Sequence, residues 1–184
     1  MGREIRRVPP TWEHPTQDCP HSPWKGGCDH ALRNGGKCFK PLHDEEYKDV
    51  ADTYMQDCLA WSHGTYKGQT KEETERDPYF WDYSGAPPDR DSYRPAFTEE
   101  ATHVQLYETV SEGTPVTPHF ATKQELIDYL VAHGDFWDQH RGDDGWNRTA
   151  AERMINDEYA PSMISIFDGS GMTLKTPRDM GTLC

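Results

Sequence analysis

The sequence predicts an α+β fold, with a small antiparallel sheet, about three helices and an irregular N-terminal segment. Apolar residues recur at helical spacing over 44–63 and 122–134, and they alternate with polar residues over 102–110. Residues 1–43 show neither period and are rich in proline and glycine, which predicts irregular structure. We therefore expect two parts, an irregular segment over 1–43 and an α+β domain over 44–184.

The first predicted helix covers residues 44–63. Asp44 is a suitable N-cap, and Gly64 ends the pattern. The apolar positions fall on one face at steps of three and four: Tyr47, Val50, Tyr54, Cys58 and Trp61. The hydrophilic stretch 65–77 predicts a loop or a frayed helical turn. Residues 78–97, where prolines interrupt aromatic residues, predict a long ordered loop.

A strand and a helix are predicted next. The alternation over 102–110 is typical of a strand. Thr122 and Glu125 then have the spacing of a capping box, ahead of an apolar stripe that ends at Gly134. These local signals agree with one another, so we expect a helix over 122–134.

Two elements are predicted near the C-terminal end. Asn147 is a suitable start for a short helix, which Pro161 bounds. Residues 162–167 and 172–175 flank a turn with two glycines, which predicts a β-hairpin.

The charge balance limits the functions that the chain can have. Of 184 residues, 19 are Lys or Arg and 32 are Asp or Glu, a formal net charge of −13 with neutral His. Duplex DNA requires a basic surface, so direct DNA binding is not expected, whereas docking on a basic partner is favoured. No apolar run is long enough for a membrane span, and no export signal accompanies the five cysteines, so we expect a reducing cytoplasm.

Cysteine and histidine are concentrated in the N-terminal segment. Thiolate and imidazole are the ligands that zinc prefers, and four of them in a tetrahedral shell form a structural site. A bound ion would also supply folding free energy to a stretch with few apolar residues. The predicted ligands are Cys19, His21, Cys28 and Cys38, with His30 or His43 as substitutes.

Two other interpretations of this cluster stay open. The spacing differs from that of a paired CxxC finger, so these residues can instead be reduced thiols and surface imidazoles in a loop. A catalytic zinc would need a nearby carboxylate base, and Asp29 and Asp44 qualify equally. The sequence therefore predicts no catalytic residue.

The aromatic stretch after residue 78 is a second candidate site. Packing against the core is the ordinary explanation, but Tyr, Trp and Arg are also the residue types enriched at interface hot spots. Stacking on single-stranded bases is disfavoured, because residues 77–100 contain more acidic than basic side chains. The predicted partner-binding residues are Tyr79, Phe80, Trp81, Tyr83, Arg90, Tyr93 and Arg94.

Several segments carry a resemblance that covers most of the chain: REIRRVPPTWEHP, KCFKPLHDEEY, APPDRDSYRPAF, EEATHVQLYETVSEGTPVTPHFAT and YAPSM. The chain resembles a group of small hypothetical proteins encoded by tailed bacteriophages. This resemblance implies expression in the cytoplasm of an infected host bacterium, and it implies no particular activity, ligand or catalytic residue.

Together these observations favour a phage accessory protein that binds a basic surface of a host or phage protein. Small acidic phage proteins often block host machinery, so the expected target is a defence or nucleic-acid-processing complex, as for anti-CRISPR or DNA-mimic proteins. Two alternatives stay open: a metal-dependent enzyme acting on nucleotides or nucleic acid, and a virion or assembly component.

Overall fold

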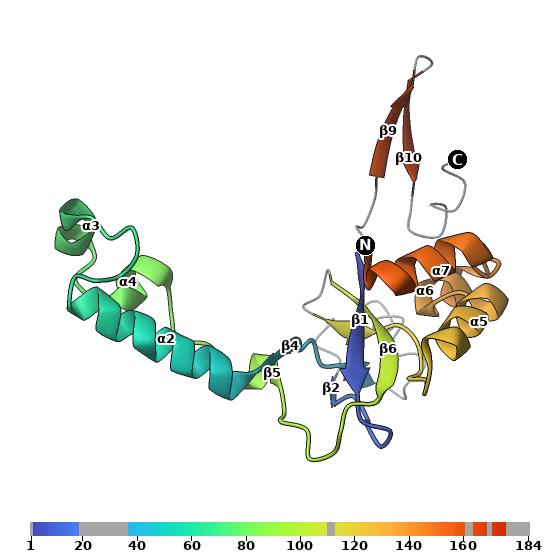
Figure 1. The fold of residues 1–184 in the computed structure, drawn as a ribbon, viewed down its shortest axis with the longest axis horizontal. Helices are drawn as coiled ribbons and strands as arrows, with labels where there is room; N and C mark the ends of the chain where they lie inside the picture. Colours follow the sequence, from blue (N-terminus) through green and yellow to red (C-terminus); the bar gives the residue numbers. More distant parts are fainter. Residues whose placement is uncertain (1, 19–36, 110–112, 161–163, 169–170, 176–184) are drawn as a thin grey trace. The chain divides into compact units, whose positions relative to one another are not determined.

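The structure is a computed structural model that describes residues 2–18, 37–109, 113–160, 164–168 and 171–175. These residues form helices and small, mostly antiparallel sheets, which confirms the predicted α+β class (Figure 1). The chain forms two compact units: unit 1 is Met1–Pro41 with Phe97–Cys184, and unit 2 is Leu42–Ala96. This division differs from the predicted one, because the N-terminal strand pairs with strands from the second half of the chain.

Unit 1 is built on a four-stranded antiparallel sheet in the order β7-β6-β1-β8. Its strands are β1 (Arg3–Val8), β6 (His103–Glu108), β7 (Thr114–Pro115) and β8 (Tyr159–Ala160). Strands β1 and β6 pair along their whole length, with Ile5 opposite Leu106. Strand β1 lies in the segment predicted to be irregular. Its buried side chains include Arg3 and Arg6, so the strand lacks the apolar alternation that marks a strand in a sequence.

Strand β6 confirms the strand predicted at 102–110, but both of its faces are buried. All five side chains from Val104 to Glu108 are buried, whereas the alternation predicts one exposed face. The polar side chains are hydrogen-bonded: Gln105 Nε2 donates to the carbonyl of Thr117 at 2.8 Å, and the Tyr107 hydroxyl donates to Gln105 Oε1 at 3.0 Å. These bonds explain how the second face is buried without an apolar surface.

Three helices pack against this sheet: α5 (Lys123–His133), α6 (Phe136–Arg141) and α7 (Arg148–Asp157). Helix α5 begins with the predicted capping box, in which the Thr122 hydroxyl accepts from the Glu125 amide at 3.1 Å. Helix α7 begins after the predicted N-cap Asn147. The shared core contains Val104, Leu106, Val116, Leu126, Ile127, Leu130, Trp146, Ala151, Met154 and Ile155.

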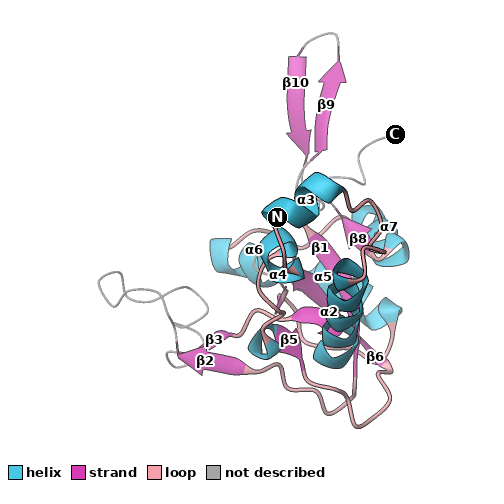
Figure 2. Ribbon diagram, turned by 90° about the vertical axis from the view of Figure 1, so that its left-hand side faces the viewer, coloured by secondary structure: helices cyan, strands magenta, loops and turns pink. Residues whose placement is uncertain are grey.

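Two short ribbons belong to unit 1 as well (Figure 2). Strands β9 (Ile164–Asp168) and β10 (Gly171–Lys175) form the predicted C-terminal hairpin. Strands β2 (Thr16–Asp18) and β3 (Lys37–Phe39) pair with Asp18 opposite Lys37, and these two side chains form a 2.5 Å ion pair.

Unit 2 is organised around one long helix, α2 (Tyr47–Ser62). The helix follows strand β4 (His43–Glu46), which pairs in parallel with β5 (Tyr93–Arg94). The helix predicted over 44–63 is therefore confirmed, but it begins later, because residues 43–46 are extended and Glu46 is the N-cap.

Three short helical elements lie between residues 65 and 97. The first falls in 65–77, where a loop or a frayed helical turn is predicted, and the other two replace the long loop predicted over 78–97. The three elements are α3 (Lys71–Arg76), α4 (Phe80–Ser84) and the 3-10 turn η2 (Arg90–Ser92). Helix α3 has a complete capping box between Thr70 and Glu73, the same signal that predicts α5.

Candidate binding surface

Aromatic side chains form the interior of unit 2. Trp61, near the end of α2, is 2% exposed, and its ring stacks on that of Tyr83 with centroids 4.4 Å apart. Phe80 and Tyr66 lie beside it, with centroids 6.0 and 5.8 Å from Trp61. The Trp61 indole also donates to the carbonyl of Asp77 at 3.1 Å. These contacts hold α4 against α2, so the short helix has a fixed support.

Three of the predicted partner-binding residues lie exposed on or next to α4. Tyr79, Trp81 and Tyr83 keep 56%, 49% and 41% of their surface accessible. Tyr79 and Trp81 stack on each other in parallel, with centroids 4.6 Å apart and planes 11° from parallel. Phe80, between them in sequence, is only 3% exposed and packs in the aromatic interior, so it is not part of this exposed stack.

The other predicted partner-binding residues lie near the C-terminal end of unit 2. Arg90 is exposed on η2, while Tyr93 is half-buried and packs its ring 4.8 Å from that of His43. Arg94 donates to the carbonyl of Asp44 and lies 3.3 Å from a Glu46 carboxylate oxygen. Tyr93 and Arg94 therefore hold β5 against β4.

Two exposed apolar residues on α2 were not predicted as site residues. Met55 and Leu59 are 59% and 57% exposed and lie one turn apart on the same side of the helix. At about 100° per residue, Leu59 points about 160° away from Trp61. The sequence contains a signal for this exposure, because both apolar residues fall outside the predicted apolar face that includes Trp61.

A groove of about 550 Å³ lies within unit 2, beside the first three turns of α2. Carboxylates from Glu45, Glu46, Asp49 and Asp57 line it together with the rings of Tyr54, Tyr66 and Phe80. Desolvation raises the pKa of Tyr54, so its phenol stays protonated, and the hydroxyl donates to the carbonyl of Gly85 at 2.8 Å. The groove is thus both acidic and aromatic.

The predicted zinc ligands fall mainly outside the described residues. Cys19, His21, Cys28 and the substitute His30 all lie there. Cys38 is 5% exposed in β3, and His43 is half-buried in β4. Within the described part of the chain, no three His, Cys, Asp or Glu side chains are placed to hold a metal ion.

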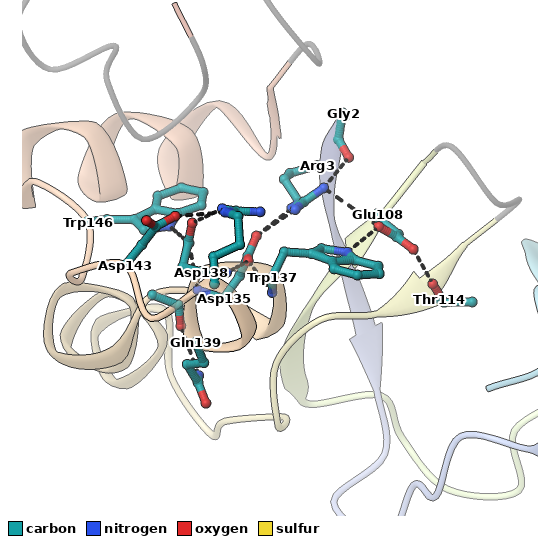
Figure 3. A network of polar contacts seen from close by, with 12 residues as sticks. Gly2, Arg3, Glu108, Thr114, Asp135, Trp137, Asp138, Gln139, Asp143 and Trp146 are labelled. Atoms are coloured by element: carbon teal, nitrogen blue, oxygen red, sulfur yellow. Dashed lines mark hydrogen bonds and ion pairs between the residues drawn. The ribbon is translucent and has the colours of Figure 1, made fainter. Parts of the chain in front are cut away.

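A buried polar network in unit 1 joins β1, β6 and the start of α6 (Figure 3). Asp135 accepts two hydrogen bonds from the Arg3 guanidinium, at 2.6 and 2.8 Å, and its other oxygen caps α6 by accepting from the Trp137 and Asp138 amides. The Trp137 indole donates to Glu108 at 2.7 Å. Because these carboxylates already have hydrogen-bond donors, the network stabilises unit 1 and offers no open ligand position.

Histidines 103 and 119 come together at one end of β6. Their ring centroids are 5.3 Å apart, and His119 Nδ1 is buried without a hydrogen-bond partner among the described residues. Burial, with a smaller contribution from His103, lowers the pKa of His119. The metal-dependent enzyme alternative would need acidic side chains beside this pair to hold an ion. Among the described residues, no three His, Cys, Asp or Glu side chains form such a group.

Comparisons with protein-family models, with curated proteins and with solved structures find no match for this chain. Among the described residues, none of the helices combines the length and apolar character that crossing a bilayer requires. The candidate surface therefore depends on the geometry of unit 2 alone.

Proposed function

We propose that this chain is a phage accessory protein that binds a basic surface of a host or phage protein in the cytoplasm of an infected bacterium. Helix α4 of unit 2 provides the contact, with Trp81 at its centre. The proposed target is a defence or nucleic-acid-processing complex, whose activity is blocked when its basic channel is covered. A net charge of −13 supports this choice of partner, because it accelerates encounter with a positive surface.

The observation that carries the proposal is the exposed, parallel stack of Tyr79 and Trp81. Large aromatic rings are costly to leave in water, and they lose little side-chain entropy when a partner covers them. The stack is also held in place, since α4 is anchored through Phe80 and Tyr83 to Trp61. A rigid aromatic anchor of this kind is typical of interface hot spots.

Affinity capture from infected cells tests the proposal. Tagged wild-type protein is compared with Trp81→Ala and with Tyr159→Ala, which removes an equally exposed ring (57%) from strand β8 in unit 1. A protein retained by the wild type and by Tyr159→Ala, but lost from Trp81→Ala, supports binding through α4. Equal recovery with all three chains rejects it. High salt should weaken a specific complex, because its encounter is electrostatic.

We also propose that a structural zinc ion is bound through Cys19, His21, Cys28 and Cys38, with His30 or His43 as substitutes. The register of the β2–β3 pair supports this, because Cys38 lies opposite Gln17, only two residues before Cys19 in the sequence. The burial of Cys38, next to a segment with few apolar residues, is also consistent with a metal ion that stabilises this segment.

A further inference from the structure

The groove of unit 2 has the size of a ligand site. Its volume of about 550 Å³ lies within the range of about 300–1,000 Å³ that is common for binding pockets. It is lined by Tyr66 and by residues of α2, α4, β4 and β5. Helices α2 and α4 pack against each other (Figure 1). The groove is therefore formed by elements of a single unit.

The electrostatics of the groove favour a cation. Of the described residues that line it, four are carboxylates and one, Arg94, is cationic. The Arg94 guanidinium already contacts the Glu46 carboxylate and the Asp44 carbonyl. Lys48, on the adjoining turn of α2, pairs with Asp52 at 2.7 Å. Asp49 and Asp57 thus add negative charge that these two cations do not offset.

The aromatic lining identifies the kind of cation. The Phe80 ring lies 5.3 Å from that of Tyr54 and 5.2 Å from that of Tyr66, so three rings converge on this groove. A guanidinium or ammonium group is attracted to ring faces, and a planar guanidinium also stacks on them. A bare metal ion would need converging carboxylates, but no three acidic, His or Cys side chains of the described residues are placed to coordinate one.

We propose that this groove binds an arginine-bearing segment of the partner protein. Its guanidinium groups lie against Tyr54 and Tyr66, and the opposing charges come from Asp49 and Asp57, which lie about 12 Å apart along α2. This inference rests on the proposed function, because it assigns the chemistry of the basic surface that α4 approaches. It adds a second, electrostatic contact with the partner to the aromatic contact made by Trp81.

A peptide titration tests the groove directly. The probe is a seven-residue glycine peptide with two arginines and blocked ends, and its control carries citrulline, the neutral isostere, in place of arginine. Calorimetry at low salt is run with the wild type, with Asp49→Asn/Asp57→Asn, and with Glu72→Gln/Glu75→Gln on α3. The last variant removes the same charge from unit 2 outside the groove lining.

We expect the wild type to bind the arginine peptide and not the citrulline peptide, with affinity about tenfold weaker in the groove variant and within about twofold in the control variant. Equal weakening in both variants, or equal binding of both peptides, overturns the proposal.

Partner capture separates the groove assignment from the proposed function. If Trp81→Ala loses the partner while Asp49→Asn/Asp57→Asn retains it, the groove assignment fails and the proposed function stands. If both variants retain it, both fail.

Discussion

Arg3 and Asp135 form a buried ion pair that joins the first strand of unit 1 to the N-cap of α6. The guanidinium Nη2 lies 2.6 Å from Asp135 Oδ2, Nε lies 2.8 Å from the same oxygen, and the residues are 6% and 2% exposed. Because the two positions are 132 residues apart, the contact ties the two segments of a discontinuous unit together.

Replacing one member of this pair should be costly. Arg3→Met leaves the Asp135 carboxylate buried without its guanidinium, and we expect a loss of about 3–5 kcal/mol in the free energy of unfolding, measured with urea. The double variant Arg3→Met/Asp135→Asn should recover part of that loss. The control is Arg153→Met, which breaks an exposed pair with Asp157 and should cost less than about 1 kcal/mol. Equal effects at both arginines would contradict the buried-pair interpretation.

The close approach at Gly145 gives a prediction from packing. A Cβ atom there would lie 2.0 Å from the Val131 carbonyl oxygen, in backbone that cannot move aside without disturbing the hydrogen bond from the Trp146 amide to the Leu130 carbonyl. We expect Gly145→Ala to lower the free energy of unfolding by about 1–3 kcal/mol or more. A thermal or urea midpoint equal to that of the wild type would contradict this packing.

His14 makes the stability of unit 1 depend on pH. Burial lowers its pKa from 6.5 to about 4, and its ring contacts the Lys40 carbonyl at 2.7 Å and the Tyr107 hydroxyl at 3.1 Å. Between pH 6.5 and 4 the unfolded chain binds a proton that the folded chain does not. The contribution of neutral His14 to the free energy of unfolding is therefore fully present above pH 6.5. It falls by up to about 3 kcal/mol as the pH drops toward 4.

The measurement is urea unfolding at pH 7.5 and 4.5 for the wild type and for His14→Gln, whose amide can still donate to the Lys40 carbonyl. Other groups titrate equally in both proteins, so the difference isolates His14. We expect the variant to lose less stability on acidification. An identical loss in both proteins would show that His14 is not held neutral.

Zinc is tested on the full chain, purified without added metal. Elemental analysis should give about one equivalent of zinc, and a chelator should lower the melting temperature. Cys38→Ser should reduce the zinc content, whereas Cys58→Ser, at a half-buried position on α2, should leave it unchanged. Less than about one tenth of an equivalent, with a melting temperature insensitive to chelator, would reject the site.

Local signals in the sequence predict the elements that depend on near neighbours. The capping box at Thr122 and the N-cap at Asn147 place α5 and α7 correctly, because each satisfies backbone amides within three residues. The box between Thr70 and Glu73 carries the same information for α3, although the hydrophilic composition around it predicts only a loop or a frayed helical turn.

Features that depend on distant partners leave no such local signal. Strand β1 buries Arg3 because Asp135 and Glu108, both far along the chain, face its guanidinium, so no apolar alternation marks it. For the same reason, the sequence does not show which of Phe80 and Trp81 is buried. They are adjacent in sequence, and only the packing of α4 against Trp61 decides which ring is buried and which is exposed.

The most direct test of the proposed function measures affinity for the captured partner with wild-type protein and with Trp81→Ala, beside urea unfolding of both. We predict affinity at least about tenfold weaker for Trp81→Ala, with an unchanged unfolding midpoint, because the ring is half-exposed and lies in the proposed contact surface. A dissociation constant within about twofold of the wild-type value would contradict binding through α4.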